Sequence, residues 1–345
     1  MVSSRNASQR QTQSSIKPIN VDASAVAYAV HLIHQVCCFA GPFDLIEEFR
    51  DQDLIAAVAR HDTAALFNRL MHDFSFQGIS DQIAENYMAR HGQATWASVR
   101  KNLAKRPTCP KLQTYWHFHA CRYEKTTGTC TEPDHIAACP LPTHRLRNGH
   151  LNQIAYSLFL FIRDVADGDL ISWIDDRLDQ AAGQAGSDRL MAAGHALIEP
   201  LRNVYGVSDK VLAMALSALL IGADDVRPNW LQVGAHLIAV DTLVHNFLHR
   251  TGILKRLKAA HAYGPDCYRP DGCADIIARI AQEIDARAFN RTFPAYFPRF
   301  VQLAIWRYCS QQGLDICNGN RVDDRYQCQN RHCRLHWLCD RVLLK

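Results

Sequence analysis

The chain has 345 residues, enough to bury a sizeable hydrophobic core, and its length alone is compatible with about two domains. With 38 lysines and arginines against 34 aspartates and glutamates, the formal charge is only +4, which excludes a protein that binds nucleic acid through strong overall basicity. The hydrophobic content of 48% and the charged content of 21% are ordinary for a globular protein and indicate no function.

The apolar runs and the N-terminus predict where the protein resides. No apolar run approaches the roughly 20 residues that span a bilayer, and the N-terminus lacks the apolar core of a signal peptide. Residues 1–20 are rich in Ser, Gln and Asn, which predicts a disordered tail. We therefore expect a cytoplasmic protein without membrane association. In that compartment the 13 cysteines favour metal or iron–sulfur ligation over disulfides, because cytosolic thiols are kept reduced.

Helical periodicity dominates the chain. Apolar residues recur at intervals of three and four, with few of the alternating runs that are typical of strands. These stretches are 24–39, 42–60, 63–73, 79–91, 150–167, 169–182, 187–203, 209–221, 229–249, 274–288 and 294–312. The pattern predicts an all-α fold.

Two segments indicate a function. Residues 204–212 read Val-Tyr-Gly-Val-Ser-Asp-Lys-Val-Leu, a tight turn at Gly206 that opens a helix, and such a turn directs backbone N–H groups toward a phosphate. Residues 237–244 read Leu-Ile-Ala-Val-Asp-Thr-Leu-Val, which places one carboxylate, Asp241, at the mouth of an apolar helix. A turn that grips phosphate, followed by an isolated acid, predicts excision of a base from DNA.

These segments resemble the helix-hairpin-helix and catalytic-aspartate motifs of the endonuclease III superfamily of DNA glycosylases, which typically read L-P-G-V-G-x-K-T-A and I-A-V-D-T-H. The resemblance implies that Asp241 is the essential aspartate and that Lys210 is the nucleophilic lysine of bifunctional members. It also implies DNA contacts from Gly206 and Ser208, although Ser208 replaces the second glycine of the hairpin. Lys210 and Asp241 stand further apart than in the family, with the excess in 222–230, so an exposed Lys210 without a catalytic role is the alternative.

The chemistry of such an enzyme follows from the bond that it breaks. Cleavage of an N-glycosidic bond builds positive charge on the sugar, so a fixed carboxylate at Asp241 stabilises the transition state more than the ground state. A neutral Lys210 would attack the sugar and form a Schiff base, which permits strand cleavage. Without that attack, an activated water leaves an abasic site. Asp241 would also cap its helix, and the two roles are compatible.

A third segment, residues 74–84, resembles the S-x-Q-x-x-x-x-x-A helix start of these glycosylases. The resemblance implies that Gln77 lies at the DNA face, where it fills the space of a flipped base or contacts the opposite strand, and that Ser80 lies beside it. The alternative is a plain helix start capped by Ser80. Two groups of basic residues are candidates for phosphate contacts: Arg250 with Lys255, Arg256 and Lys258, and Arg321 with Arg325, Arg331 and Arg334.

The last cysteines of the chain resemble the cluster of endonuclease III-like enzymes, which end in C-x6-C-x2-C-x5-C around a [4Fe–4S] cluster. This chain has Cys317, Cys328, Cys333 and Cys339, and only the last interval is kept. The resemblance implies a [4Fe–4S] cluster, with zinc as the alternative, because four thiolates in a short loop suit either. Cys309 could replace Cys317, but its place in an amphipathic run favours a buried structural cysteine.

A second cysteine group has no counterpart in the family. Cys109, Cys121, Cys130 and Cys139 lie in a Pro-rich stretch together with His117, His119, His135 and His144. Their density favours a structural zinc, although the spacing matches no C-x2-C finger, and scattered reduced cysteines are the alternative.

The target base is set by a pocket outside these motifs, for which we consider Tyr115, Trp116 and residues 152–156 as walls. The inserts at 109–149 and 222–236 favour a bulky hypermodified base, such as those of phage DNA, over common oxidised pyrimidines. Antiviral defence is then an alternative to DNA repair.

We therefore expect a two-lobed helix-hairpin-helix DNA glycosylase with a central helical barrel and a C-terminal metal-cluster loop. Its parts are a tail at 1–20, a barrel at 61–108 and 150–254, a Cys/His-rich insert at 109–149, and paired terminal helices with the cysteine cluster at 21–60 and 255–345. It would act as a monomer on double-stranded DNA that contains a modified base. The alternative is a non-catalytic helix-hairpin-helix DNA-binding protein with a structural iron–sulfur or zinc centre.

Overall fold

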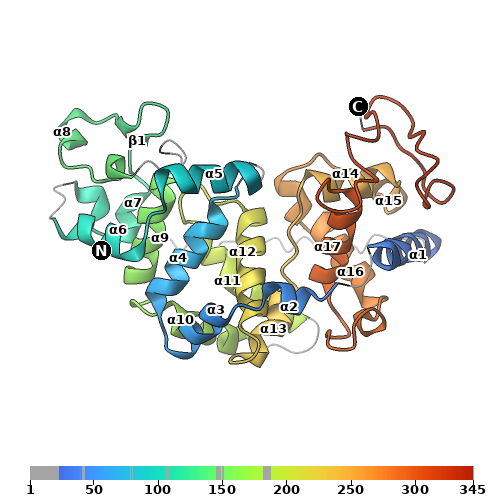
Figure 1. Ribbon diagram of the computed structural model, residues 1–345, viewed down its shortest axis with the longest axis horizontal. Coiled ribbons are helices and arrows are strands. Elements are labelled where there is room, and N and C mark those ends of the chain that lie inside the picture. Colours follow the sequence, from blue (N-terminus) through green and yellow to red (C-terminus); the bar gives the residue numbers. More distant parts are fainter. Residues whose placement is uncertain are drawn as a thin grey trace, which may run out of the picture.

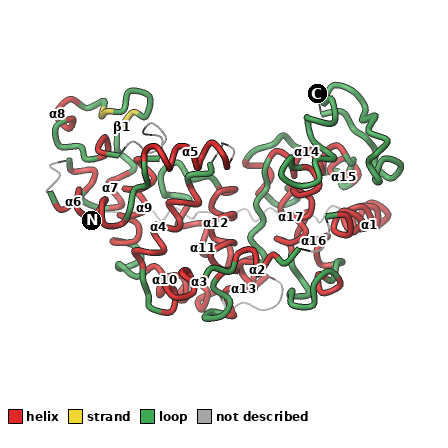
Figure 2. Tube along the Cα trace, in the orientation of Figure 1, coloured by secondary structure: helices red, strands yellow, loops and turns green. Residues whose placement is uncertain are grey.

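The computed structural model describes residues 23–40, 43–77, 79, 81–105, 109–144, 149, 151–181 and 188–344. Within them the chain forms seventeen α-helices, four 3-10 helices and one two-stranded sheet (Figures 1 and 2). The prediction of an all-α class is confirmed, with the small sheet as an addition. The expected tail at 1–20 and Ser80 lie outside the described residues.

The elements follow one another along the chain with short connections. The helices are α1 Ala23–Phe39, α2 Leu45–Phe49, α3 Gln52–Ala59, α4 Thr63–Phe74, α5 Asp81–His91, α6 Trp96–Ala104, α7 Tyr115–Phe118, α8 Pro133–Ile136, α9 Asn152–Asp164, α10 Leu170–Ala181, α11 Asp188–Leu201, α12 Asp209–Gly222, α13 Pro228–Gly234, α14 Thr242–Arg250, α15 Ile253–Arg256, α16 Cys273–Gln282 and α17 Pro298–Cys309. Strands β1 Tyr123–Glu124 and β2 Thr129–Cys130 pair antiparallel. The 3-10 helices are η1 Pro110–Leu112, η2 Leu141–Thr143, η3 Pro265–Tyr268 and η4 Ala286–Ala288.

Two hydrophobic cores divide the molecule into two lobes that lie side by side in Figure 1. The first core is built mainly by α3, α4 and α9 to α13, which we call the first lobe. The second core is built by α1 and α14 to α17, the second lobe. Helix α2 lies at the junction, because it contacts α12 while its Leu45 and Ile46 belong to the second core.

Local sequence explains the individual helices. In α4 the Asp62 side chain accepts a hydrogen bond from the Ala65 N–H at 3.0 Å, which caps the helix, and its buried residues recur on one face. Helix α12 is apolar on nearly all sides and is buried accordingly, with contacts to α2, α3, α4, α11 and α13. It is therefore the helix around which the first lobe packs.

Two of the expected helices are interrupted. The expectation of one helix over 42–60 is wrong, because Asp51 accepts bonds from the N–H groups of Asp53 and Leu54 and so starts a new helix, α3. One helix over 229–249 is also wrong: α13 ends at Gly234, and α14 begins only after Asp241. Apolar periodicity does not reveal such a break when the intervening residues, 235–240, are apolar and buried apart from His236. Helix α6 was not expected.

Candidate active site and cysteine centres

A pocket of about 640 Å³ lies where the two lobes meet. This volume falls in the range of small-molecule sites. The first lobe contributes the side of α12 and the connection after α4, and the second lobe contributes α17, the start of α14 and residues 310–320. Its lining includes Phe76, Lys210, Asp241, Arg299, Gln302 and Trp306.

Asp241 is the N-cap of α14 and faces this pocket. Its carboxylate accepts a hydrogen bond from the Val244 N–H at 2.9 Å, and the Trp306 side chain also bonds to it. Burial raises the pKa of Asp241 above the usual range, while the bond from Val244 and the nearby charge of Lys210 act against that shift. The result is a fixed carboxylate in a poorly hydrated place, aimed into a cavity.

Lys210 stands in the first turn of α12 and lines the same pocket. Its charge is close enough to Asp241 to lower the pKa of that carboxyl. The long sequence spacing does not separate the two residues, because residues 228–234 fold into α13, which packs along α12 and returns the chain to the pocket. The excess residues are thus used in helix packing and leave the two candidate catalytic groups together.

The turn between α11 and α12 lies beside the pocket. Gly206 has φ +78°, a left-handed conformation that favours glycine, and Ser208 is an exposed N-cap whose side chain makes no cap hydrogen bond. The Gln77 side-chain N–H donates to the Gly206 carbonyl at 2.7 Å. The neighbour of Gln77, Phe76, lines the pocket. The structure therefore brings Gln77, Gly206 and Lys210 to one region, although they come from distant parts of the sequence.

A buried arginine in the pocket was missed by the sequence reasoning. Arg299, in the first turn of α17, is 4% exposed, and its guanidinium contacts the Gln302 side-chain oxygen. Its Nε finds no hydrogen-bond partner among the described residues, and burial lowers its pKa to about 10. The signal in the sequence was a charged residue in the apolar stretch that follows Pro298. Burial of a cation there costs free energy unless the cation is paired or binds a ligand.

The pocket walls suggested from sequence do not line this cavity. Residues 152–156 are buried in α9 inside the first lobe. Asn152 donates to the carbonyls of Leu141 and His144 at 2.9 and 2.7 Å, and Tyr156 donates to the Pro140 carbonyl at 3.2 Å. This segment therefore anchors the cysteine-rich insert to the first lobe.

The four cysteines of the insert are brought near one another. The β1–β2 pairing sets Cys130 opposite Tyr123, two residues after Cys121. Burial raises the pKa of Cys139 to about 11, and the charges of Cys121, Cys130 and Cys109 add to the shift. All four are free thiols, and Cys109 and Cys130 are buried.

The C-terminal cysteines gather at the ends of α14 and α17. The Arg250 guanidinium contacts the Cys317 sulfur at 3.5 Å, and the Cys339 sulfur lies 3.6 Å from the Arg250 carbonyl. The Tyr308 hydroxyl lies 3.1 Å from the Cys333 sulfur. Burial raises the pKa of Cys339 to about 12, and the charges of Cys317, Cys333 and Cys328 raise it further. Cys309 is fully buried beside Cys317.

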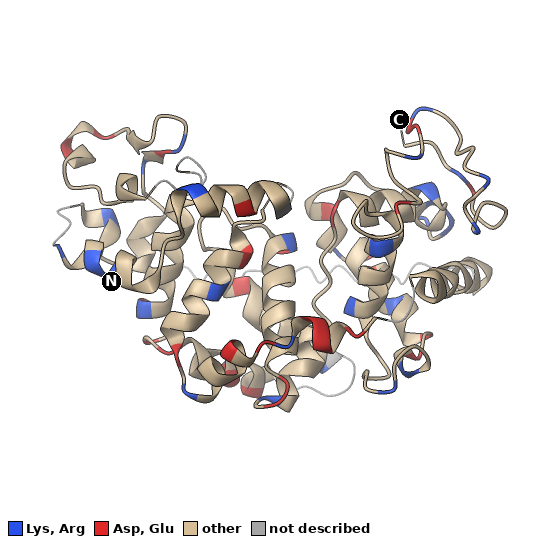
Figure 3. Cartoon of the chain, viewed as in Figure 1, with Lys and Arg blue, Asp and Glu red and all other residues tan. Residues whose placement is uncertain are grey.

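Arg250 is placed differently from the expected phosphate contact. It is 2% exposed and forms an ion pair with Asp324, because the last turn of α14 points into the C-terminal segment and not toward solvent. Lys255 and Lys258 are exposed, whereas Arg256 pairs with Asp340. Figure 3 shows further basic residues along the C-terminal segment and acidic residues on α2.

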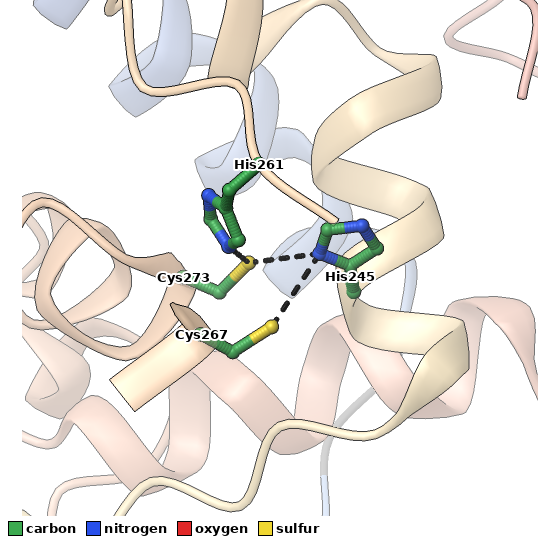
Figure 4. A group of neighbouring side chains, drawn as sticks. All are labelled: His245, His261, Cys267 and Cys273. Carbon is green, nitrogen blue, oxygen red and sulfur yellow. Dashed lines mark hydrogen bonds between the residues drawn. The ribbon is translucent and has the colours of Figure 1, made fainter. Parts of the chain in front are cut away.

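A separate group of four ligand-type residues lies in the second lobe (Figure 4). The nitrogen and sulfur atoms of His245, His261, Cys267 and Cys273 all lie within 4.8 Å of one another, which no other group of at least three His, Cys, Asp or Glu residues achieves in the described part of the chain. This group could hold a metal ion. The sequence reasoning missed it, although the interval Cys267-x5-Cys273 after two histidines was a visible signal.

Comparisons with protein-family models, with curated proteins and with solved structures found no match to this chain. No helix in the described ranges joins the length and the apolar character needed to cross a membrane.

Proposed function

We propose that the protein is a DNA glycosylase that extrudes a modified base from double-stranded DNA and cleaves its N-glycosidic bond. The observation that carries this proposal is the meeting of Asp241 and Lys210 at one pocket between two helical lobes, with the Gln77–Gly206 contact beside it. These are the residues to which the resemblance to endonuclease III-like enzymes assigns roles in catalysis and DNA contact. No feature of their sequence spacing requires that they meet.

The pocket environment suits the chemistry of an oxocarbenium-like transition state. Asp241 is held by its cap bond to Val244 and by Trp306, so its carboxylate needs no reorganisation as positive charge develops on the sugar. Lys210 beside it is placed to attack the sugar or to orient the DNA. In the first case the enzyme also cleaves the strand, and in the second it leaves an abasic site.

The turn at Gly206 is proposed to grip a backbone phosphate. Ser208 is exposed and its side chain makes no cap bond, and the N-terminus of α12 carries the backbone N–H groups that favour an anion. Gln77, bonded to this turn, would then stand next to the opened base pair. A phosphate at the turn would place the adjoining nucleotide close to the pocket.

The pocket favours a bulky base rich in hydrogen-bond acceptors. Its volume of about 640 Å³ exceeds what an unmodified pyrimidine needs. At its wall, Arg299 offers a buried cation whose Nε lacks a partner in the described chain, and Gln302 adds an amide. Such donors suit carbonyl or hydroxyl groups on a hypermodified base, which fits a role in defence against phage DNA as well as in repair.

We also propose a [4Fe–4S] cluster at Cys317, Cys328, Cys333 and Cys339. Cys317 and Cys339 lie around Arg250, and Cys333 lies beside Tyr308. The sulfurs of the four cysteines do not all lie within 4.8 Å of one another, the spacing that suits ligands of a single ion. The sulfurs around a cuboidal cluster stand further apart than those around one zinc. The insert cysteines, Cys109, Cys121, Cys130 and Cys139, are proposed as a structural metal site, for which zinc is the candidate; their sulfurs also do not all lie within 4.8 Å of one another, so zinc would have to draw them closer together.

The test is base release from a panel of duplexes. Each duplex carries one modified base, including oxidised pyrimidines, alkylated purines and glucosylated hydroxymethylcytosine, and released bases are measured by mass spectrometry. We expect release from a bulky modified base by the wild-type protein and none by Asp241→Asn. Tight duplex binding without release from any substrate would overturn the enzyme proposal and leave the non-catalytic DNA-binding module.

The role of Lys210 is tested separately by borohydride trapping on a substrate that the panel identifies. A Schiff base gives a covalent protein–DNA adduct, which should be absent in Lys210→Gln. Lys101→Gln is the matched control, because Lys101 is exposed on α6, does not line the pocket and belongs to neither group of candidate phosphate contacts. Base release without any adduct would assign the protein a water-dependent mechanism and Lys210 a positioning role.

A further inference from the structure

His245, His261, Cys267 and Cys273 converge from four parts of the second lobe (Figure 4). His245 projects from α14, His261 lies in the loop after α15, Cys267 lies in η3, and Cys273 is the first residue of α16. Both cysteines and His245 are buried, and His261 is partly buried. The site is therefore closed to bulk solvent on most sides.

The distances in this group match those of ligands around one tetrahedral ion. The His245 Nδ1 lies 3.3 Å from the Cys273 sulfur and 3.5 Å from the Cys267 sulfur, and the His261 Nε2 lies 3.3 Å from the Cys273 sulfur. With zinc–sulfur bonds of about 2.3 Å and zinc–nitrogen bonds of about 2.0 Å at tetrahedral angles, sulfur and nitrogen ligands stand about 3.5 Å apart. Ordinary packing does not require four such atoms to meet at one point.

The chemistry of the donors selects the metal. Two thiolates and two imidazoles are soft and intermediate ligands, which zinc prefers and which calcium and magnesium do not. Four protein ligands complete a tetrahedral shell and leave no position for water or substrate. Such a closed set is typical of a structural site and not of a catalytic one.

The backbone around the two cysteines is shaped to bring them together. A Cβ on Gly272 would stand 2.3 Å from the Asp266 carbonyl oxygen and 2.8 Å from the Cys267 carbonyl carbon, so only glycine permits this close approach. The chain from Cys267 to Cys273 thus folds back on itself tightly. It consists of a 3-10 turn and a polar loop, a segment that builds little core of its own.

This segment also holds the backbone that presents Asp241. The Val240 N–H donates to the Tyr268 hydroxyl at 2.8 Å, and that hydroxyl lies 3.3 Å from the Val240 carbonyl. Tyr268 follows Cys267 directly, and Val240 precedes Asp241 directly. His245 lies on α14, the helix that Asp241 caps, so the four-residue group also contacts the helix that follows Asp241.

We propose that His245, His261, Cys267 and Cys273 bind one structural zinc ion, which fixes η3 and the start of α16 against α14 and thereby braces the backbone at Asp241. The site is distinct from the two cysteine groups at 109–139 and 317–339. Its existence does not depend on the glycosylase activity.

The test is metal content by mass spectrometry on the full-length protein, with zinc and iron counted separately. Cys273→Ser and Cys267→Ser should each lose one zinc per chain while iron stays unchanged. Cys38→Ser is the matched control, because Cys38 also lies beside a histidine, His34 at 3.8 Å, but belongs to no such ligand group among the residues that the structure describes. An unchanged zinc count in both site variants would overturn the proposal.

A second variant keeps the test decisive if the serine variants fail to fold. His261→Cys retains four ligands, so it should still bind the metal, and after cobalt exchange its thiolate-to-cobalt absorption should be stronger than that of the wild type. Identical cobalt spectra in the two proteins would refute coordination by His261.

Amide hydrogen exchange of the wild type tests the effect on the backbone at Asp241. Removal of this zinc should speed exchange at Val240 and across 261–273. Unchanged protection at Val240 would refute the proposal that the zinc site holds this backbone in place.

Discussion

At the scale of single residues, Asp241 combines two roles that have opposite demands. As an N-cap it stabilises α14 through its bond to the Val244 N–H. As a buried carboxylate with a raised pKa, its ionised form is disfavoured by the fold. The proposed catalytic role uses the ionised form, so the residue is held for function at some expense of stability.

Asp241→Asn separates the two roles. The amide keeps a side-chain oxygen for the Val244 N–H but carries no charge, so the helix cap is retained. We expect base release to fall by about 10²-fold or more, because charge stabilisation of the transition state is lost. The melting temperature at neutral pH should be equal to or above that of the wild type. A clear drop in melting temperature would contradict this reading of the site.

The pH dependence follows from the same raised pKa. The rate of base release should fall in acid as Asp241 becomes protonated, and this limb should lie at a higher pH than that of an ordinary aspartate. The stability effect has the opposite sign: because the folded pKa is raised, the contribution of Asp241 is fully favourable below its unfolded pKa and is lost as pH rises through the folded pKa. Melting curves of the wild type and Asp241→Asn should therefore converge in acid and diverge toward neutral pH.

At the scale of elements, α14 connects three sites. It begins at Asp241 in the pocket, carries His245 into the proposed zinc site, and ends with Arg250 against Cys317 and Asp324. The break between α13 and α14 makes this possible, because one continuous helix would place Asp241 in its interior with no free N–H groups to receive a cap. The position of a helix start is here a functional feature.

The turn before α12 allows a matched test of phosphate binding. Gly206 and Gly168 have almost the same backbone, with φ of +78° and +79°, and an added Cβ meets no close contact at either. Replacement of either by alanine should cost about 1 kcal/mol of unfolding free energy. Only Gly206→Ala should also weaken duplex binding, by about tenfold, since Gly168 lies between α9 and α10. Equal binding by both variants would exclude the turn from the DNA contact.

At the scale of the whole molecule, the pocket exists because two separately packed lobes meet. The wall of the pocket includes Met214 and Ala239 from the first core and Leu243 and Trp306 from the second. Helix α1 packs on α16 and α17, so the first helix of the described chain completes the second lobe. The C-terminal segment then covers the ends of α14 and α15, where Val342 donates to the Arg250 carbonyl at 2.8 Å.

Arg250 is the most buried of the charged residues that attach this C-terminal segment to the second lobe. Arg250→Gln removes the partner of Asp324. Because the Asp324 side chain is 28% exposed, we expect the free energy of unfolding to fall by about 2 to 3 kcal/mol, at or below the lower end for a buried ion pair. The visible absorption of the proposed iron–sulfur cluster should fall with it. Arg256→Gln, which breaks a more exposed pair with Asp340, should cost less than about 1 kcal/mol and keep the colour. Full retention of iron in Arg250→Gln would contradict the assigned role.

The sequence by itself determined the helical class and the residue types of the candidate site. Apolar periodicity is a local property, so most helices were found within a few residues, and Asp241, Lys210 and Gln77 were identified from short motifs. Apolar periodicity did not locate the break at 235–241, because five of its seven residues are apolar and buried. The capping signal at Asp241 and Thr242 did mark a helix start, and the structure confirms that α14 begins there.

Only the tertiary structure decided which of these residues meet. The folding of 228–234 onto α12 brings Lys210 back to Asp241 despite their spacing, and the burial of Arg250 follows from a C-terminal segment far along the chain. Arg299 and the cysteines at 267 and 273 left signals in the sequence, but the groups that each of them faces depend on the packing of elements from several parts of the chain. Local sequence patterns predict single helices. A site depends on the distances between helices, and tertiary packing sets those distances.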